Sequence, residues 1–442
     1  MKKDNQNLKF KHSPIGPIPK DWEVRRLGDI VEVKGGYAFD SRKFKDQGTY
    51  QVVKMSNLYD SALDLNRSKS FLDELNNAEK ESLLKVGNIV ITLTGTTGKR
   101  DYGYSYLIQE EKNLVVNQRV AKISVIEGDP KYLFYEFKTN RFLDQFFYSA
   151  RGGTGNQANI GTADLLSIKI PLPCASEQRE IGLALSTWDK AIAKTTQLIT
   201  AKEQRKKWLM QQLLTGKKRL KGFKDAWRIS NFDDCFEIIK SYSISRDGLS
   251  RDLNDSSTYC IHYGDIHALY ETNFLDFSKQ IGIPQITGIE QSISERDYLF
   301  DGDLVLADAS EDYEGVGETI EVTNLGKKAA VGGLHTIVMR AKQNKVSVGY
   351  RAYLFASEPL RNELRRKATG TSVYSVTKST LQTLSFKLPS MEEQKAISNI
   401  LQTADKEINL LKQKLQAYKE QKKGLMQVLL TGKVRLKVKE TA

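Results

Sequence analysis

The sequence has 442 residues, more than one hydrophobic core usually supports, so it predicts two or more domains. Hydrophobic residues make up 40% and charged residues 27%, a balance that excludes a disordered chain. Three scattered cysteines exclude a disulfide scaffold, and no apolar run reaches the length of a membrane span. We therefore expect a cytoplasmic protein with no membrane partner.

The first region, residues 22–172, contains short β-rich runs such as Ile89–Leu93 and Val120–Val125, and a Tyr- and Phe-rich stretch, Tyr132–Phe137, that we expect to be helical. This mixture predicts an α+β domain. Gly95–Lys99 follows a strand like a phosphate-binding loop, but it has two residues between its glycines where the nucleotide-binding loop needs four. We expect a β-hairpin tip there instead.

The next segment predicts a long helix, because apolar residues recur at alternating spacings of four and three with no internal proline. Alignment of residues 173–221 with 389–437 at a constant offset of 216 gives 24 identities in 49 positions, so the segment is repeated at the end of the chain. Each copy begins with Pro and a Glu-Gln pair and ends in Leu-Leu-Thr-Gly-Lys and Arg-Leu-Lys.

The second region, residues 227–388, has further β-rich runs and is faintly related to the first. Trp22 and Tyr37 correspond to Trp227 and Tyr242 at an offset of 205, and Gly87–Ile91 corresponds to Gly302–Leu306 at an offset of 215. Cys260, His262, Asp265 and His267 include metal-ligating residue types, but no partner motif accompanies them. We expect no metal site and, since no catalytic motif is found, no catalysis by this chain.

The two long helices should pair, because neither amphipathic helix is stable alone. Parallel pairing would place Lys206 opposite Lys422, whereas antiparallel pairing about residues 197 and 413 places both lysines opposite uncharged residues. We therefore expect an antiparallel coiled coil. Its expected seam residues are Ile181, Leu185, Trp188, Ile192, Ile199, Ile397, Leu401, Ile408, Leu411 and Leu415. Residues 181–213 would span about 48 Å, more than one turn of B-DNA at about 35 Å.

The positive charge is concentrated in two places. The formal net charge is +13, and residues 202–224 and 412–439 each carry nine basic residues and one acidic residue. Solvated helix ends explain such clusters as well as an anionic partner does. Two equal clusters in one duplicated chain nevertheless favour a nucleic acid.

The whole pattern resembles the specificity subunit of type I restriction-modification systems. The resemblance covers nearly the whole chain and is carried by the order, twice over, of its motifs. These are Ile18–Ile30, Gly87–Lys99, Gly153–Ile160, Glu177-Gln178 after Ile-Pro-Leu-Pro, Leu209–Lys217 with its copy Leu425–Lys433, Tyr259–Ala268 and Asp308–Gly317. One departure is Val373, which stands at the position of Gln157 in the second half.

The resemblance implies an α+β fold in which two target recognition domains are separated by the antiparallel coiled coil in a pseudo-twofold internal repeat. The expected segments are residues 1–174 and 218–389 for the recognition domains, and 175–217 and 390–442 for the helical spacers. The chain would be a non-catalytic subunit that reads a split, asymmetric site on double-stranded DNA. Two modification (methyltransferase) subunits and restriction subunits would be its partners, and S-adenosylmethionine, ATP and Mg would bind to those partners. The alternative is a coiled-coil adaptor without sequence-specific DNA binding.

Phosphate contacts by Lys and Arg set the register of a protein on DNA, whereas amide, guanidinium and aromatic side chains read base edges. The expected DNA-contacting residues lie in both regions, and each has the alternative of being a solvated or fold-stabilising polar residue. In the first region they are Lys99, Arg100, Gln118, Arg119, Arg151, Asn156, Gln157 and Asn159, and in the second Tyr263, His267, Asp312, Tyr313, His335, Thr371 and Tyr374.

Overall fold

The computed structural model describes residues 9–59, 62–152, 156–252, 258–270, 272–287 and 293–436, with the side chains of Arg151 and Gly152 left aside. The chain divides into two compact units. Unit 1 comprises residues 1–196 and 414–442, and unit 2 comprises residues 197–413. The expected α+β fold with a duplicated organisation is confirmed.

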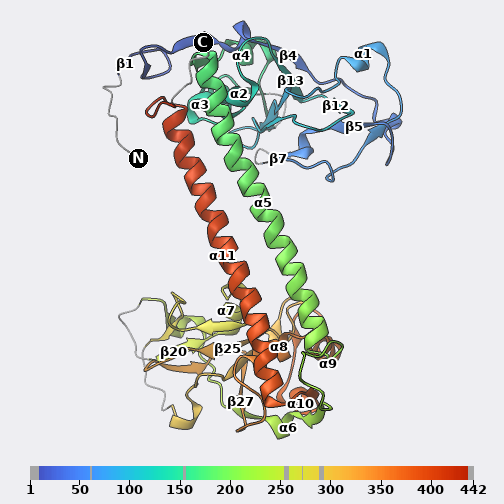
Figure 1. Cartoon of the computed structure of the whole chain (residues 1–442), viewed down its shortest axis with the longest axis vertical. Coiled ribbons are helices and arrows are strands. Elements are labelled where there is room, and N and C mark those ends of the chain that lie inside the picture. The colour runs from blue at the N-terminus through green and yellow to red at the C-terminus, as the bar shows by residue number, and fades with distance from the viewer. Residues whose placement is uncertain are drawn as a thin grey trace. The chain divides into compact units, whose positions relative to one another are not determined.

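Unit 1 is built from small sheets and short helices that precede one long helix (Figure 1). Its strands are β1 Phe10–Lys11, β2 Ile18–Pro19, β3 Glu23–Arg26, β4 Val31–Gly35, β5 Tyr50–Val53, β6 Leu58–Tyr59, β7 Ala62–Leu63, β8 Phe71–Leu72, β9 Ile89–Thr92, β10 Thr94–Thr96, β11 Ser105–Leu107, β12 Leu114–Val116, β13 Val120–Val125, β14 Arg151–Gly152, β15 Gln157–Asn159 and β16 Lys169–Leu172. Its helices are α1 Asn77–Lys80, α2 Pro130–Glu136, α3 Asn140–Tyr148, α4 Thr162–Ser167, the first part of α5 Ala175–Leu213 and the last part of α11 Met391–Leu429.

Unit 2 has the same general composition. Its strands are β17 Arg228–Asn231, β18 Phe236–Ile239, β19 Leu249–Ser250, β20 Thr258–Ile261, β21 Phe274–Asp276, β22 Gln285–Ile286, β23 Leu304–Ala307, β24 Ala309–Ser310, β25 Thr319–Thr323, β26 Ala329–Gly332, β27 Thr336–Ala341, β28 Tyr374–Ser375 and β29 Ser385–Leu388. Its helices are the last part of α5, α6 Phe232–Cys235, α7 Tyr263–Ala268, α8 Tyr350–Ala356, α9 Glu358–Lys367, α10 Lys378–Gln382 and the first part of α11 Met391–Leu429.

The sheet orders show that the two units share one frame. In unit 1 the strand order β4-β13-β9-β11 matches β18-β27-β23-β25 in unit 2, where β21 is added at the edge. The parallel pair β5-β12 matches β20-β26, and the antiparallel pair β3-β16 matches β17-β29. The faint sequence relation between the two regions therefore reflects a common fold.

The turn at Thr97–Gly98 lies in the connection between β9 and its antiparallel partner β11, but a simple hairpin is not formed. The first part of that connection is β10, which leaves β11 and pairs with β15 instead. Gly98 has a φ of +76°, a left-handed conformation that glycine adopts without strain.

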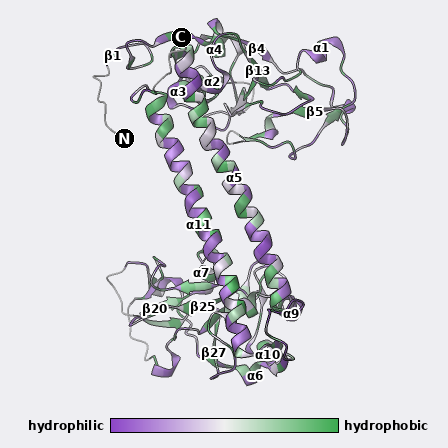
Figure 2. Ribbon diagram, viewed as in Figure 1, coloured by the Kyte–Doolittle hydropathy of each residue, from purple (hydrophilic) through white to green (hydrophobic). Residues whose placement is uncertain are grey.

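Helices α5 and α11 run antiparallel in each unit, as expected. In unit 1 the ring of Trp188 contacts the ring of Tyr418, with centroids 5.4 Å apart. In unit 2 Lys202 pairs with Glu407, and the later Lys206 pairs with the earlier Asp405, so residue numbers rise along α5 as they fall along α11. Green and purple alternate along both helices, as amphipathic helices require (Figure 2).

The expected seam residues differ in their environment along the helices. Six of the ten are buried and four are half-buried: the buried ones are Ile181, Leu185, Ile199, Ile397, Leu401 and Ile408, and the half-buried ones are Trp188, Ile192, Leu411 and Leu415. Ile181 and Leu185 belong to the core of unit 1, whereas Ile397 and Leu401 belong to the core of unit 2. The starts of both helices are therefore packed into domain cores instead of forming a free coiled coil.

The repeated Leu-Leu-Thr-Gly-Lys motif ends both long helices. Gly216 and Gly432 have φ values of +69° and +68°. The N–H of Lys218 donates to the carbonyl of Gln212 and the N–H of Val434 donates to that of Val428, each at 3.1 Å. This six-residue bond is the Schellman arrangement, which needs a left-handed residue just after the helix.

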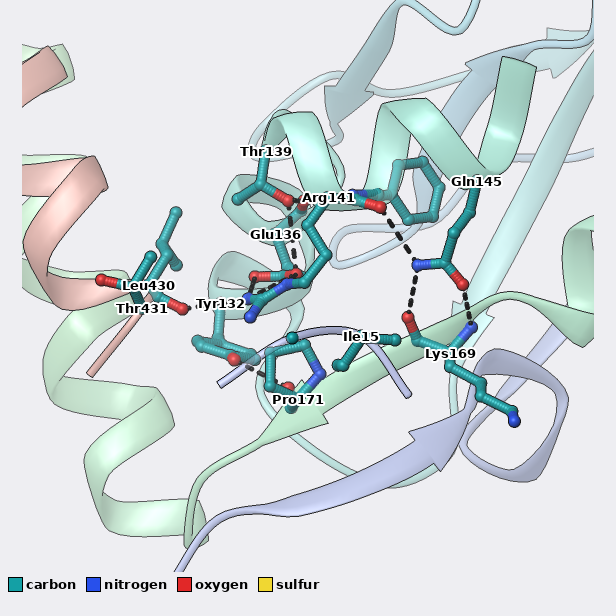
Figure 3. Close-up of polar contacts among 12 residues, drawn as sticks. Ile15, Tyr132, Glu136, Thr139, Arg141, Gln145, Lys169, Pro171, Leu430 and Thr431 are labelled. Atoms are coloured by element: carbon teal, nitrogen blue, oxygen red, sulfur yellow. Dashed lines mark hydrogen bonds and ion pairs between the residues drawn. The ribbon is translucent and has the colours of Figure 1, made fainter. Parts of the chain in front are cut away.

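The end of α11 is fixed to the first domain by a buried polar cluster (Figure 3). Arg141 donates to the carboxylate of Glu136 at 3.0 Å and to the carbonyl of Leu430 at 3.1 Å. Gln145, which lies on α3 as Arg141 does, donates to the carbonyl of Lys169 at 2.9 Å. The tail of the second repeat segment thus completes unit 1, although it is far away in the sequence.

Candidate nucleic-acid interface

In unit 1, a three-stranded sheet brings together loops that are distant in the sequence. Its order is β10-β15-β14, so Thr96 pairs with Gln157, and Asn159 pairs with Thr94 on one side and Arg151 on the other. The N–H of Thr97 donates to the carbonyl of Asn156 at 3.1 Å. Lys99 and Arg100 follow that turn directly.

The loop between β12 and β13 joins the same sheet through Leu93. The N–H of Leu93 donates to the carbonyl of Arg119 at 2.9 Å, and its own carbonyl accepts from Ile160 at 3.0 Å. All eight residues expected to contact DNA in the first region therefore lie in connected segments. We call this set the first polar surface: Lys99, Arg100, Gln118, Arg119, Arg151, Asn156, Gln157 and Asn159.

The members of the first polar surface differ in how their side chains are engaged. Lys99, Gln118, Arg119, Asn156 and Gln157 are exposed, and within the described part of the chain no side-chain hydrogen bond or ion pair occupies them. These five remain available to a ligand.

Two other members of this surface already have partners. Arg100 pairs with Asp144 at 2.8 Å and lies over the Phe147 ring at 5.0 Å, while Asn159 accepts from the Thr94 hydroxyl at 2.6 Å. These contacts indicate that Arg100 and Asn159 stabilise the loops on which they lie. The side chain of Arg151 lies outside the described residues, as do Gly153–Gly155 of the family motif.

The expected residues of the second region are linked in the same way. The rings of Tyr263 and His335 contact each other edge to face at 5.2 Å, and those of Tyr313 and Tyr374 at 5.4 Å. The small sheet β24-β28 joins these two pairs, because the N–H of Asp308 donates to the carbonyl of His335 just before β24 begins. We call this set the second polar surface: Tyr263, His267, Asp312, Tyr313, His335, Thr371 and Tyr374.

His267 is held on both sides of its ring. Its Nδ1 lies 2.7 Å from the carboxylate of Glu318, and its Nε2 lies 2.9 Å from the carbonyl of Ala309. Both neighbours are acceptors, so the arrangement favours the doubly protonated imidazolium. The hydrogen bond to Glu318 raises the pKa of His267. His267 thereby joins α7 to β24.

Four members of the second polar surface are exposed, whereas Tyr263, His267 and Tyr374 are half-buried. His335 is about half exposed, at 51% of its side chain, and its Nδ1 bonds Asp308 at 3.2 Å. Burial raises the pKa of the Asp308 carboxyl. Tyr313 and Thr371 are exposed, whereas the Asp312 carboxylate accepts from the N–H of Gly315 and so shapes its own loop.

The metal-ligand residue types of the second region have other partners. His262 accepts from the N–H of Gly264 at 3.1 Å, and Asp265 pairs with Arg251 at 2.6 Å. Cys260 is a buried residue of β20, and burial raises the pKa of its thiol to about 12. Within the described residues, no group of three or more His, Cys, Asp and Glu side chains is placed to hold a metal ion.

A buried closure at the start of each long helix was not foreseen from the sequence. In unit 1 the Glu177 carboxylate accepts from the Trp22 indole at 3.1 Å and from Arg435 at 2.7 Å. In unit 2 the Glu393 carboxylate accepts from the Trp227 indole at 3.2 Å, and Arg219 donates to it at 2.7 Å.

These closures explain why the repeat keeps the glutamate of its Glu-Gln pair and its final arginine. Glu177 and Arg435 are 258 residues apart in the sequence, so their contact was out of reach of local pattern analysis. Their counterparts Glu393 and Arg219 lie at the constant offset of 216, and this identity was the available signal.

A second duplicated cluster ties a domain helix to the long helices. Tyr135 donates to Asp189, which also accepts from Lys422 at 2.6 Å. In unit 2 the same arrangement is made by Tyr353, Asp405 and Lys206, with Tyr353 donating at 2.6 Å and Lys206 pairing at 2.5 Å. The two lysines that argue against parallel pairing are thus neutralised by aspartates, Asp189 for Lys422 and Asp405 for Lys206.

Part of the basic cluster at residues 202–224 is therefore structural. Lys202, Lys206 and Arg219 pair with carboxylates of unit 2. Arg205, Lys207, Lys217, Lys218, Lys221 and Lys224 are exposed. The cluster keeps a solvent-facing positive charge after its internal pairs are formed.

None of the helices in the described part of the chain has the length and hydrophobicity that a bilayer crossing requires.

Comparison with known proteins identifies relatives along the full length of the chain. A protein of Methanocaldococcus jannaschii named putative type I restriction enzyme MjaX specificity subunit is 25% identical, covering 97% of each chain. The type I restriction enzyme MjaVIII specificity subunit of the same organism is 27% identical, covering 95% of this chain and 94% of the relative.

The solved S subunit of a type I restriction-modification system from M. genitalium has the same fold, with a TM-score of 0.57 at 14% identity over 97% of this chain and 98% of that one. No comparison favours the coiled-coil adaptor alternative. The model of the type I restriction modification DNA specificity domain matches residues 19–204 and again residues 224–420, so the chain belongs to this family and carries its domain twice.

Proposed function

We propose that this chain is the DNA sequence-specificity subunit of a type I restriction-modification complex, in which each recognition domain reads one half of a split, asymmetric site. One observation carries the proposal: two polar surfaces are built on the same backbone frame but present different side chains. Two surfaces with the same backbone frame can each dock on a segment of one DNA duplex. Because their side chains differ, they can read two different base sequences.

The chemistry of the two surfaces supports DNA as the ligand. The first surface offers free amides at Gln118, Asn156 and Gln157 with cations at Lys99 and Arg119, a combination that reads base edges and contacts phosphates. The second offers aromatic and imidazole groups. Exposed lysines and arginines at the ends of α5 and α11 add the sequence-independent attraction to phosphates.

The partners and cofactors follow from this assignment. Two modification subunits that methylate adenine would bind around the duplicated helices, and ATP-dependent restriction subunits would join them for cleavage. S-adenosylmethionine, ATP and Mg would bind to those partners, and this chain would contribute no catalytic group. The complex would act on DNA in the cytoplasm.

The test is to co-express the chain with its modification subunit in a host that lacks adenine methylation, and to map modified adenines across the genome. The proposal expects one motif made of two specific parts separated by unspecified bases. Methylation at a continuous motif, or none above the level of the modification subunit alone, would contradict it. Purified chain that binds protein partners but shows no DNA sequence preference would support the adaptor instead.

A further inference from the structure

Two residues with long or ionisable side chains adopt the left-handed backbone conformation, one in each unit. Arg119 has a φ of +72° and His335 a φ of +54°. The other non-glycine residues with positive φ in the described part of the chain are Ser68, Asn113, Asn324 and Asn344. Asparagine and histidine are enriched among the uncommon non-glycine residues in this conformation and arginine is not, and such conformations concentrate at functional sites.

Arg119 and His335 occupy the same structural position. The Arg119 carbonyl accepts from the N–H of Leu93 at 2.9 Å, and the His335 carbonyl accepts from the N–H of Asp308 at 3.1 Å. The following residues, Val120 and Thr336, begin the equivalent strands β13 and β27. The backbone frame therefore places one side chain at the same point of each polar surface.

This position keeps a hydrogen-bonding side chain in both units, whereas the positions of Gln118 and Gln157 do not. Gln118 is replaced by Leu334, and Gln157 by Val373, in the equivalent places of the second surface. Amide readout at those places therefore exists only in the first half. A common contact in both half-sites has to come from another position, and Arg119 with His335 meets that requirement.

Both side chains are available to a ligand. Arg119 is exposed, and its guanidinium has no hydrogen bond or ion pair with any described residue. His335 uses Nδ1 toward Asp308 at 3.2 Å and packs edge to face on Tyr263, which leaves Nε2 as its open nitrogen. In an imidazole tautomer whose Nδ1 donates to a carboxylate, Nε2 is the acceptor nitrogen.

We infer that residues 119 and 335 are the matched base-reading positions of the two recognition domains, with Arg119 selecting guanine and His335 selecting a base that offers an amino group. This inference rests on the proposed function. Arginine matches the two major-groove acceptors of guanine, O6 and N7. An imidazole acceptor matches the exocyclic amino group of cytosine or adenine in the same groove. The left-handed backbone holds each side chain at that point.

The test maps the methylated motif of the full complex with the modification subunit for Arg119→Gly, Arg119→Lys and His335→Gly. Glycine suits a positive φ, so these variants remove the side chain without adding backbone strain. The expected result is relaxation at one base position of one half-site for both Arg119 variants, by about tenfold or more in discrimination. His335→Gly should relax one position in the other half-site only.

The matched control is Lys85→Ala, an exposed lysine of unit 1 outside both polar surfaces, which should leave the motif unchanged. A uniform fall in methylation with an unchanged motif would mean a phosphate contact and would overturn the inference. An unchanged motif and rate would overturn it as well. If the complex with the unmutated chain methylates no split motif, the proposed function itself fails. That outcome is distinct from a failure of the inference, in which the unmutated complex methylates a split motif and the variants do not relax it.

Discussion

The closures and the polar surfaces were both duplicated, but they have diverged differently. In the closures the side chains are the same in the two units: Glu177 with Arg435, and Glu393 with Arg219. On the polar surfaces the backbone hydrogen bonds are the same, but the side chains differ: Arg119 corresponds to His335, and Gln157 corresponds to Val373. Contacts that hold the frame have been kept, and positions that face solvent have been free to change.

The largest effect should come from opening a closure. Arg435→Ala and Arg219→Ala each leave a buried carboxylate without its cation, which typically costs about 3–5 kcal/mol. Chemical denaturation of the full chain should show similar losses for the two variants. Asp21→Ala removes only the exposed extra partner of Arg435 and should cost less than about 1 kcal/mol. A large loss for Asp21→Ala would mean that the two closures are not equivalent.

The two glycines that end the long helices should differ in how much an alanine substitution destabilises the fold. Alanine at Gly432 would bring its Cβ to 2.2 Å from Pro19 Cγ, whereas alanine at Gly216 meets Trp227 at an ordinary 3.5 Å. Both changes carry the left-handed strain of about 1–2 kcal/mol, and Gly432→Ala adds a clash with a proline ring. Thermal unfolding should therefore rank Gly432→Ala as clearly more destabilising. Equal melting temperatures would contradict the observed packing.

A pH-dependent contribution is expected in the second polar surface. The raised pKa of His267 means that the folded state holds its proton more tightly than the unfolded state does. The stabilisation is fully present below the unfolded pKa of about 6.5 and is lost as pH rises through the higher folded pKa. His267→Gln should cost about 1–2 kcal/mol below pH 6.5 and should flatten the decline above it. Urea unfolding across this pH range measures both, and an identical slope in the variant would refute the assignment.

The smallest effect should come from the tyrosines that donate to Asp189 and Asp405. Tyr135→Phe and Tyr353→Phe each remove one hydrogen bond, worth about 1 kcal/mol, and leave the lysine pair of the aspartate in place. Because the two clusters have the same composition, their losses should agree within about 0.5 kcal/mol. A clear inequality in denaturation midpoints would show that one cluster is held by further contacts.

The sequence predicted the features that repeat. Identities at the offset of 216 located the two long helices, and the opposed Lys206 and Lys422 gave their antiparallel direction. The expected hairpin at Lys99 was not formed as a simple hairpin, because β10 pairs with β15 across more than sixty residues. Pairing over such distances leaves no local pattern.

The chemical state of individual side chains was also beyond the sequence. Lys99, Arg100 and Asn159 are all polar residues, and the sequence alone does not distinguish them. In the structure Arg100 pairs with Asp144 and Asn159 accepts from Thr94, while Lys99 is exposed. The two ring nitrogens of His267 lie beside two acceptors, Glu318 and the carbonyl of Ala309, which only the tertiary fold brings there. Which polar residues face a ligand is decided by the tertiary neighbours, so the sequence located the regions better than the contacts.

The most direct test of the account replaces residues 227–388 with the corresponding recognition domain of a relative from the same family, and maps the methylated motif of the resulting complex. Two independent reading surfaces predict that one half of the motif changes to that of the donor while the other half stays as it was. A motif that stays unchanged in both halves, or that changes in both, would contradict the claim that each domain reads its own part of the DNA.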